Sequence, residues 1–119
     1  MNIKTFQDLQ VWQKGHEFVL QVYKITQRFP DNEKFGLVNQ LRRSAASICA
    51  NIAEGGKKSR KDYLRFLEIS DGSLEETKYH LILSKDLGYI SQEEFESLFD
   101  LANNIGRMLS SLMKGLRES

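Results

Sequence analysis

The chain has 119 residues, 40% of them hydrophobic and 28% charged, and its formal net charge is +1 at pH 7. These values are ordinary for one small globular domain, and they exclude a uniformly basic nucleic-acid-binding protein. No apolar run approaches the roughly 18 residues of a membrane-spanning helix, and Met1 to Phe6 lacks the apolar centre of a signal peptide. We expect a single domain over residues 1–119, located in the cytoplasm and independent of membranes.

Charge is divided unevenly along the chain. Residues 1–66 carry a net charge of +6, and residues 67–119 carry −5. Such asymmetry indicates a polar partner, or self-association between unlike surfaces. The alternative is that antiparallel helices interleave the two halves and blur the field.

The first helical segment runs from about Asp8 to Arg28. Its apolar residues recur at helical spacing, and Pro30 ends it because proline cannot continue a helix. Gly15 lies inside this pattern, where a small residue permits close approach of a neighbouring helix. Lys24 and Arg28 lie near the carboxyl end, where the helix dipole favours cations.

The second segment begins between Glu33 and Leu37 and ends at Gly55, which is typical of glycine at a helix terminus. One side carries a regular apolar stripe. The other side is small and apolar where a surface helix normally shows charge. This side consists of Ala46, Cys49, Ala50 and Ala53. Two interpretations remain open: a central helix in the core of one monomer, or a helix that packs inward on its own bundle and outward on a neighbouring subunit.

The third segment runs from Ser59 to about Leu87, and the fourth begins at Ser91. The spacing of Ser91 and Glu94 predicts a capping box, in which each side chain bonds the backbone N–H of the other residue. Ser70 and Ser73 flank Gly72 inside the third helix, where glycine is unfavourable, so we expect this patch of small residues to pack closely against another helix.

The four segments and their short connections predict an all-α fold, an antiparallel up-down-up-down four-helix bundle. The residues expected to form the core are those that recur on the apolar sides of the helices. They are Leu41, Ile48, Ile52, Leu67, Leu74, Leu81, Leu98, Ile105 and Leu109.

Several short motifs occur together in a fixed order over roughly residues 4–115. They are Phe6 to Trp12 (FQDLQVW), Phe29-Pro30, Gln40 to Arg43 (QLRR), Ser47-Ile48, Asn51 to Gly55 (NIAEG), Gly72 to Glu76 (GSLEE) and Leu87-Gly88-Tyr89. This ordered set resembles the four-helix-bundle proteins encoded in 23S rRNA intervening sequences. A related branch is the accessory variability determinant (Avd) of diversity-generating retroelements. Cys49 and Ser44 stand where the pattern often has proline and alanine, and neither difference affects the expected fold.

The resemblance implies a homopentamer of four-helix bundles and, in the retroelement branch, partnership with a reverse transcriptase. The near-neutral charge of this chain favours the broader intervening-sequence family over the strongly basic retroelement type. The leading hypothesis is a non-enzymatic oligomeric scaffold that binds RNA or DNA, a nucleic-acid enzyme, or both. The alternative is a purely structural protein–protein interaction module.

The densest group of cations follows the second helix. It consists of Lys57, Lys58, Arg60, Lys61 and Arg65. Arg42 and Arg43, earlier in the chain, are added as candidates, and the other interpretation of these two arginines is ion pairs across helices or subunits. Glycines that lead into a helix terminus can offer N–H groups to an anion, so this cluster is the candidate nucleic-acid site. Its simpler interpretation is a solvated loop. Tyr63 and Phe66 could stack on bases, although core packing is the more common use.

No catalytic or metal-binding constellation is visible in the sequence. His16 and His80 belong to no metal-ligand spacing, and a single cysteine cannot build a zinc cluster. The adjacent pair Glu75-Glu76 points in directions about 100° apart on a helix, and so cannot easily share a reacting centre. We expect a non-enzyme with no metal and no cofactor, in which Cys49 is a buried, inert thiol.

Overall fold

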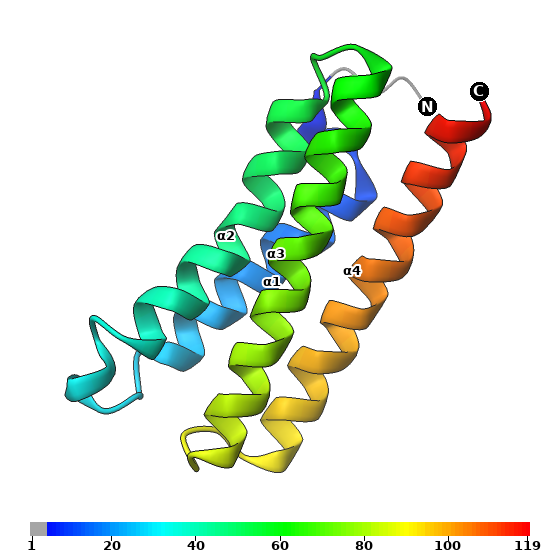
Figure 1. Cartoon of the computed structure of the whole chain (residues 1–119). Coiled ribbons are helices and arrows are strands. Elements are labelled where there is room, and N and C mark those ends of the chain that lie inside the picture. The colour runs from blue at the N-terminus through cyan, green and yellow to red at the C-terminus, as the bar shows by residue number, and fades with distance from the viewer. Residues whose placement is uncertain (1–4) are drawn as a thin grey trace.

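The computed structural model describes residues 5–119 and contains helices but no strand in that range. The elements are the 3-10 turn η1 (Phe6–Asp8), α1 (Gln10–Thr26), the 3-10 turn η2 (Asp31–Glu33), α2 (Leu37–Gly55), α3 (Arg60–Asp86) and α4 (Gln92–Glu118). Successive α-helices run in opposite directions (Figure 1). The predicted antiparallel up-down-up-down four-helix bundle is confirmed. The start of the chain, for which we expect no signal peptide, lies outside the described residues.

The first helix is shorter than predicted because its ends adopt separate local structure. The Thr5 hydroxyl accepts from the Gln7 N–H, and the Asp8 carboxylate accepts from the Thr5 N–H, which together cap η1. Leu9 is then extended, so α1 begins only at Gln10. Threonine followed three residues later by aspartate is itself a capping signal that could have been identified in the sequence.

The other helix boundaries follow the sequence signals closely. The Ser59 hydroxyl accepts from the Asp62 N–H at the start of α3. At the start of α4, Ser91 and Glu94 form the complete predicted capping box. Gly88 follows α3 with a φ of +80°, a conformation that glycine adopts without strain.

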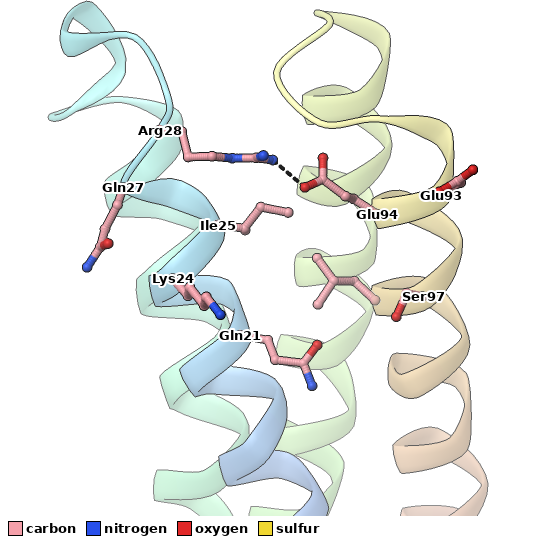
Figure 2. Close-up of a pocket in the computed structure, with 9 residues that line it drawn as sticks. Gln21, Lys24, Ile25, Gln27, Arg28, Glu93, Glu94 and Ser97 are labelled. Atoms are coloured by element: carbon pink, nitrogen blue, oxygen red, sulfur yellow. Dashed lines mark hydrogen bonds and ion pairs between the residues drawn. The ribbon is translucent and has the colours of Figure 1, made fainter.

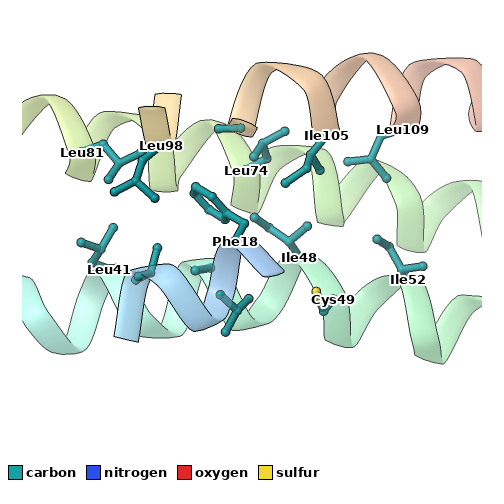
Figure 3. Close-up of a cluster of buried hydrophobic side chains, with 14 of the residues drawn as sticks. Phe18, Leu41, Ile48, Cys49, Ile52, Leu74, Leu81, Leu98, Ile105 and Leu109 are labelled. Carbon is teal, nitrogen blue, oxygen red and sulfur yellow. The ribbon is translucent and has the colours of Figure 1, made fainter. Parts of the chain in front are cut away.

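All nine residues predicted for the core are buried, and most of them are labelled in Figure 3. They lie between the four helices together with Phe18 and Val22 of α1, which are fully inaccessible to solvent. Full burial of such a side chain contributes on the order of 1.5–3 kcal/mol each. Hydrophobic burial along the bundle axis therefore holds the fold together.

Helices α2 and α3 pack through small and hydroxylated residues. The Ser70 hydroxyl donates to the Ile48 carbonyl over 2.8 Å, and the hydroxyl oxygens of Thr77 and Ser44 lie 2.8 Å apart. At the end of this seam, a Cβ atom added to Gly55 would lie 2.8 Å from the Cβ of Phe66. Glycine is required there because the two helices approach too closely for a side chain.

The expected close packing of the small patch around Gly72 against another helix is confirmed for Ser70 and Ser73, which contact α2, but not for Gly72. A Cβ atom built on Gly72 has no neighbouring atom within 4 Å among the residues that the structure describes, and Gly72 is exposed on the outer side of α3. The patch of small residues around it therefore has two sides. Ser70 and Ser73 face α2, whereas Gly72 faces away from the bundle.

Candidate nucleic-acid interface and oligomer face

The basic cluster lies at one end of the bundle, where α2 connects to α3. Lys57 and Lys58 are exposed in the connection, and Arg60 and Lys61 are exposed in the first turn of α3. The same end of the molecule contains the carboxyl end of α4, whereas the α1–α2 and α3–α4 connections lie at the opposite end (Figure 1). The structure therefore gathers the predicted cations of this segment at one end.

Two further cations join this end from α4, and sequence reasoning missed them. Arg60 donates hydrogen bonds to the carbonyl and hydroxyl oxygens of Ser119, and Arg117 lies 3.9 Å from the Glu68 carboxylate. These contacts bring the last turns of α4, with Lys114 and Arg117, beside the first turns of α3. The cations are separated by about fifty residues in sequence, so no local pattern could have joined them.

The cations of the cluster differ in whether they form ion pairs with other residues. Arg65 lies 3.6 Å from Asp62 of its own helix, a contact between exposed side chains that contributes little to stability. Lys57, Lys58 and Lys61 form no ion pair with any residue of the described range. These three ammonium groups are the ones most available to an anionic partner.

Arg42 and Arg43 are not brought into the cluster. Both lie in the second turn of α2, about 20 Å from its carboxyl end at about 1.5 Å per residue. The Arg42 guanidinium donates to the Thr26 hydroxyl over 2.8 Å and to the Tyr23 carbonyl over 3.2 Å, and it stacks over the Tyr23 ring. Arg42 therefore joins α2 to the end of α1, where the helix dipole favours a cation. Arg43 is exposed.

The small apolar side of α2 is only partly accessible. Ala50 is exposed, and Ala46 and Ala53 are half-buried. Cys49 instead turns toward α1, where its Sγ atom lies 3.9 Å from the Trp12 carbonyl oxygen. Burial raises the pKa of the Cys49 thiol to about 11, and the expected burial of this side chain is confirmed. Of the four predicted interface residues, the alanines form the accessible part.

A shallow cavity of about 670 Å³ lies between α1 and α4 at the end opposite the basic cluster (Figure 2). Ile25 and Leu98 supply apolar contacts, and Arg28 donates to the Glu94 carboxylate over 2.6 Å across the opening. This hydrogen bond lowers the pKa of Glu94. The ion pair joins two helices, and the cavity presents no set of convergent catalytic groups.

The histidines remain apart from any metal-binding arrangement in the part of the chain that the structure describes. His16 stacks on the Trp12 ring with 5.0 Å between ring centroids, and His80 Nε2 lies 3.1 Å from the Glu76 carboxylate. Residues 5–119 contain no group of three histidine, cysteine or acidic side chains that could hold a metal ion. Nor does this range contain a helix with the length and apolar character needed to cross a bilayer.

The fold and these surfaces define a small helical-bundle protein with a basic end and an accessible alanine side on one helix. Residues 7–111 match the model of the 23S rRNA-intervening sequence protein family, and the chain belongs to that family.

Solved structures support this assignment. A crystal structure of a protein with unknown function from the S23 ribosomal protein family, from Bacteroides thetaiotaomicron VPI-5482, is similar to this chain with a TM-score of 0.81. The two sequences are 32% identical, and the match covers 87% of this chain and 95% of that chain. The search of curated proteins found no match.

Proposed function

We propose that this protein is a non-enzymatic, homo-oligomeric scaffold that binds the phosphate backbone of RNA or DNA through its basic end. The observation that carries the proposal is the collection of exposed lysines at one end of the bundle that form no ion pair within residues 5–119. Lys57, Lys58 and Lys61 supply the cations, and Lys114 extends the surface from α4. Phosphate contacts position a protein on nucleic acid but carry little sequence information, so binding is expected to be largely non-specific.

Oligomerisation strengthens such a site by repeating it. A monomer with a few clustered lysines binds weakly because acidic residues elsewhere offset their charge. Linked copies raise the effective concentration of each site without any new contact. The resemblance to the Avd branch supports five copies and adds a reverse transcriptase as a candidate protein partner. The accessible alanine side of α2 supports self-association.

The salt dependence of nucleic-acid binding tests this proposal. Each neutralised phosphate is expected to contribute about 0.9 to the slope of log affinity against log salt on duplex DNA, and about 0.7 on single strands. Fluorescence anisotropy with labelled oligonucleotides measures both affinity and slope. The variant replaces Lys57, Lys58 and Lys61 together by glutamine, and we expect weaker binding with a flatter slope.

The matched control replaces Lys24, Lys34 and Lys85 by glutamine, which removes the same charge away from the basic end. This control should retain most of the wild-type slope if the basic end is the binding site. Equal losses in both triple variants would indicate a general charge effect. If the wild-type protein binds neither RNA nor DNA at low salt, the protein-only interaction module becomes the better description.

A further inference from the structure

We propose that a polar cavity between α3 and α4 binds a small zwitterion, a molecule that carries one ammonium and one carboxylate group, as free amino acids do. The cavity has a volume of about 610 Å³ and lies around the middle of both helices. Its charged lining residues are Asp71, Glu75 and Lys78 of α3 and Arg107 of α4. It contains none of the lysines assigned to the basic end, so the inference does not depend on nucleic-acid binding.

Two of the four charges in the cavity already neutralise each other. The Lys78 ammonium group lies 3.2 Å from a carboxylate oxygen of Glu75 and 5.2 Å from the centroid of the Phe99 ring on α4. The Lys78 side chain is only 20% exposed, because these contacts hold it against the neighbouring helix. This ion pair leaves one carboxylate and one cation of the cavity without a partner.

The unpaired charges are Asp71 and Arg107, on opposite walls of the cavity. Neither side chain forms an ion pair or a hydrogen bond within residues 5–119, so the two groups do not contact each other. Partial burial and the nearby Glu75 carboxylate raise the pKa of Asp71, an effect that Lys78 partly offsets. A half-buried carboxylate without a hydrogen-bond donor is unfavourable. An ammonium group placed beside Asp71 would reduce that cost.

The other polar lining residues add hydrogen-bonding groups to the wall that carries Arg107. Asn103, Ser110 and Ser111 all belong to α4, and their side chains form no hydrogen bond with another described residue. Hydroxyl and amide groups beside a guanidinium group suit a carboxylate, because each can donate a hydrogen bond to its oxygens. The acidic wall on α3 and the donor-rich wall on α4 therefore match the two ends of a zwitterion.

The balance of charge favours a zwitterion over a ligand with charge of one sign. Two carboxylates and two cations line the cavity, so their formal charges cancel. A phosphate group would meet the carboxylates of Asp71 and Glu75, and a polyamine would meet Lys78 and Arg107. Electrostatic complementarity excludes partners that bring like charges together.

A glycine keeps the two walls close enough for one small molecule to contact both. Gly106 of α4 lines the cavity, and a Cβ atom added to it would lie 3.3 Å from the Cδ2 atom of Leu74 on α3. Leu74 belongs to the core. Glycine at this position therefore allows α4 to approach α3 on the core side of the cavity.

Isothermal titration calorimetry with ω-amino acids tests the inference. The probes are β-alanine, γ-aminobutyrate and ε-aminocaproate, in which the two charged groups are separated by increasing lengths. Each zwitterion is compared with the alkyl amine and the alkyl carboxylate of the same chain length, which carry only one of the two charges. We expect the wild-type protein to bind at least one zwitterion about tenfold more tightly than either single-charge probe, because each end adds a charge-assisted hydrogen bond.

Two substitutions assign the ends of the ligand to the two walls. Asp71→Asn should lower the affinity for the zwitterion to that of the carboxylate probe, and Arg107→Gln should lower it to that of the amine probe. A merely structural role would not produce this exchange. The matched controls Asp31→Asn and Arg43→Gln remove the same charges away from the cavity and should bind like the wild type. Circular dichroism checks that all variants fold.

The inference is overturned if the wild type binds no zwitterion at millimolar concentration, or binds zwitterions and single-charge probes equally. Wild-type affinity in Asp71→Asn or Arg107→Gln would also overturn it. A double-mutant cycle of these two substitutions, measured by urea unfolding without ligand, supplies a further test. A favourable coupling energy would show that the two side chains pair directly in solution and leave no place for the ligand. None of these results changes the salt dependence by which the proposed function is tested.

Discussion

The sulfur of Cys49 on α2 occupies the space that a side chain at Gly15 of α1 would need. A Cβ atom added to Gly15 would lie 2.9 Å from the Cys49 Sγ atom, which is closer than real Cβ contacts allow. The prediction from sequence that Gly15 permits close approach of a neighbouring helix is confirmed.

This contact predicts a reversal of sign in a double-mutant cycle. Gly15→Ala alone should destabilise the fold, because overpacking typically costs about 1–3 kcal/mol. In a Cys49→Ala background the obstructing sulfur is absent, and Gly15→Ala should instead stabilise α1 by up to about 1 kcal/mol through helix propensity. Urea unfolding of the four proteins measures both steps. The same sign in both backgrounds would contradict the predicted clash.

The buried thiol predicts a loss of stability at high pH. The pKa of Cys49 is raised by burial from 9.0 to about 11, so the folded protein holds this proton more tightly than the unfolded chain does. Its contribution is complete below pH 9 and declines as pH rises from about 9 to about 11. Urea midpoints across this range should fall more steeply for the wild type than for Cys49→Ala, in which the other titrating groups are unchanged. Parallel curves would show that the thiol is not buried in solution.

The Ser44–Thr77 contact predicts energetic coupling across the α2–α3 seam. Thr77→Val retains the shape of the side chain but removes the hydroxyl that meets Ser44, and we expect a loss of about 1 kcal/mol. The double variant with Ser44→Ala should be more stable than the sum of the single effects predicts, by roughly 0.5–1.5 kcal/mol. Ser84→Ala serves as the control partner, because within the described residues 5–119 the Ser84 hydroxyl bonds only the His80 carbonyl of its own helix. Its effect should add to that of Ser44→Ala.

The centre of the core predicts a large effect from a single truncation. Ile48 is fully buried between the helices, and Ile48→Ala should destabilise the fold by about 2–5 kcal/mol. Ala50→Ser, at an exposed position two residues away on the same helix, should change stability by less than about 0.5 kcal/mol. Thermal unfolding followed by far-ultraviolet circular dichroism compares the two. A spectrum dominated by strand would refute the helical fold itself.

Sequence reasoning located the helices and the core because both follow from local spacing. Leu41, Ile48 and Ile52 share one side of α2 at helical intervals, and this periodicity is sufficient to predict their burial. Ser91 with Glu94 marked the start of α4 because a capping box involves residues only three apart. Such features need no information about how the helices are arranged.

The features that sequence reasoning missed depend on which helices are neighbours. Sequence reasoning adds Arg42 to the basic cluster by its charge and offers an ion pair across helices or subunits as the other interpretation, whereas hydrogen bonds to Thr26 and Tyr23 determine its position. Lys114 joins the basic end only because α4 returns beside the start of α3. The patch of Ser70, Gly72 and Ser73 is expected to face another helix, but spacing along one helix does not show that only the two serines do so.

The hydrogen bonds at the α2–α3 seam also have a consequence for local opening. Buried hydroxyls form hydrogen bonds between α2 and α3, and Arg42 forms hydrogen bonds from α2 to α1. In the described residues, α4 is joined to the rest of the bundle by polar contacts near the surface, such as the ion pair of Arg28 with Glu94. Elements held by few buried polar contacts exchange their amide hydrogens through openings of lower free energy. Amides of α4 should therefore exchange with deuterium before those of α2 and α3. This order would identify α4 as the helix that separates from the other three at the lowest free energy.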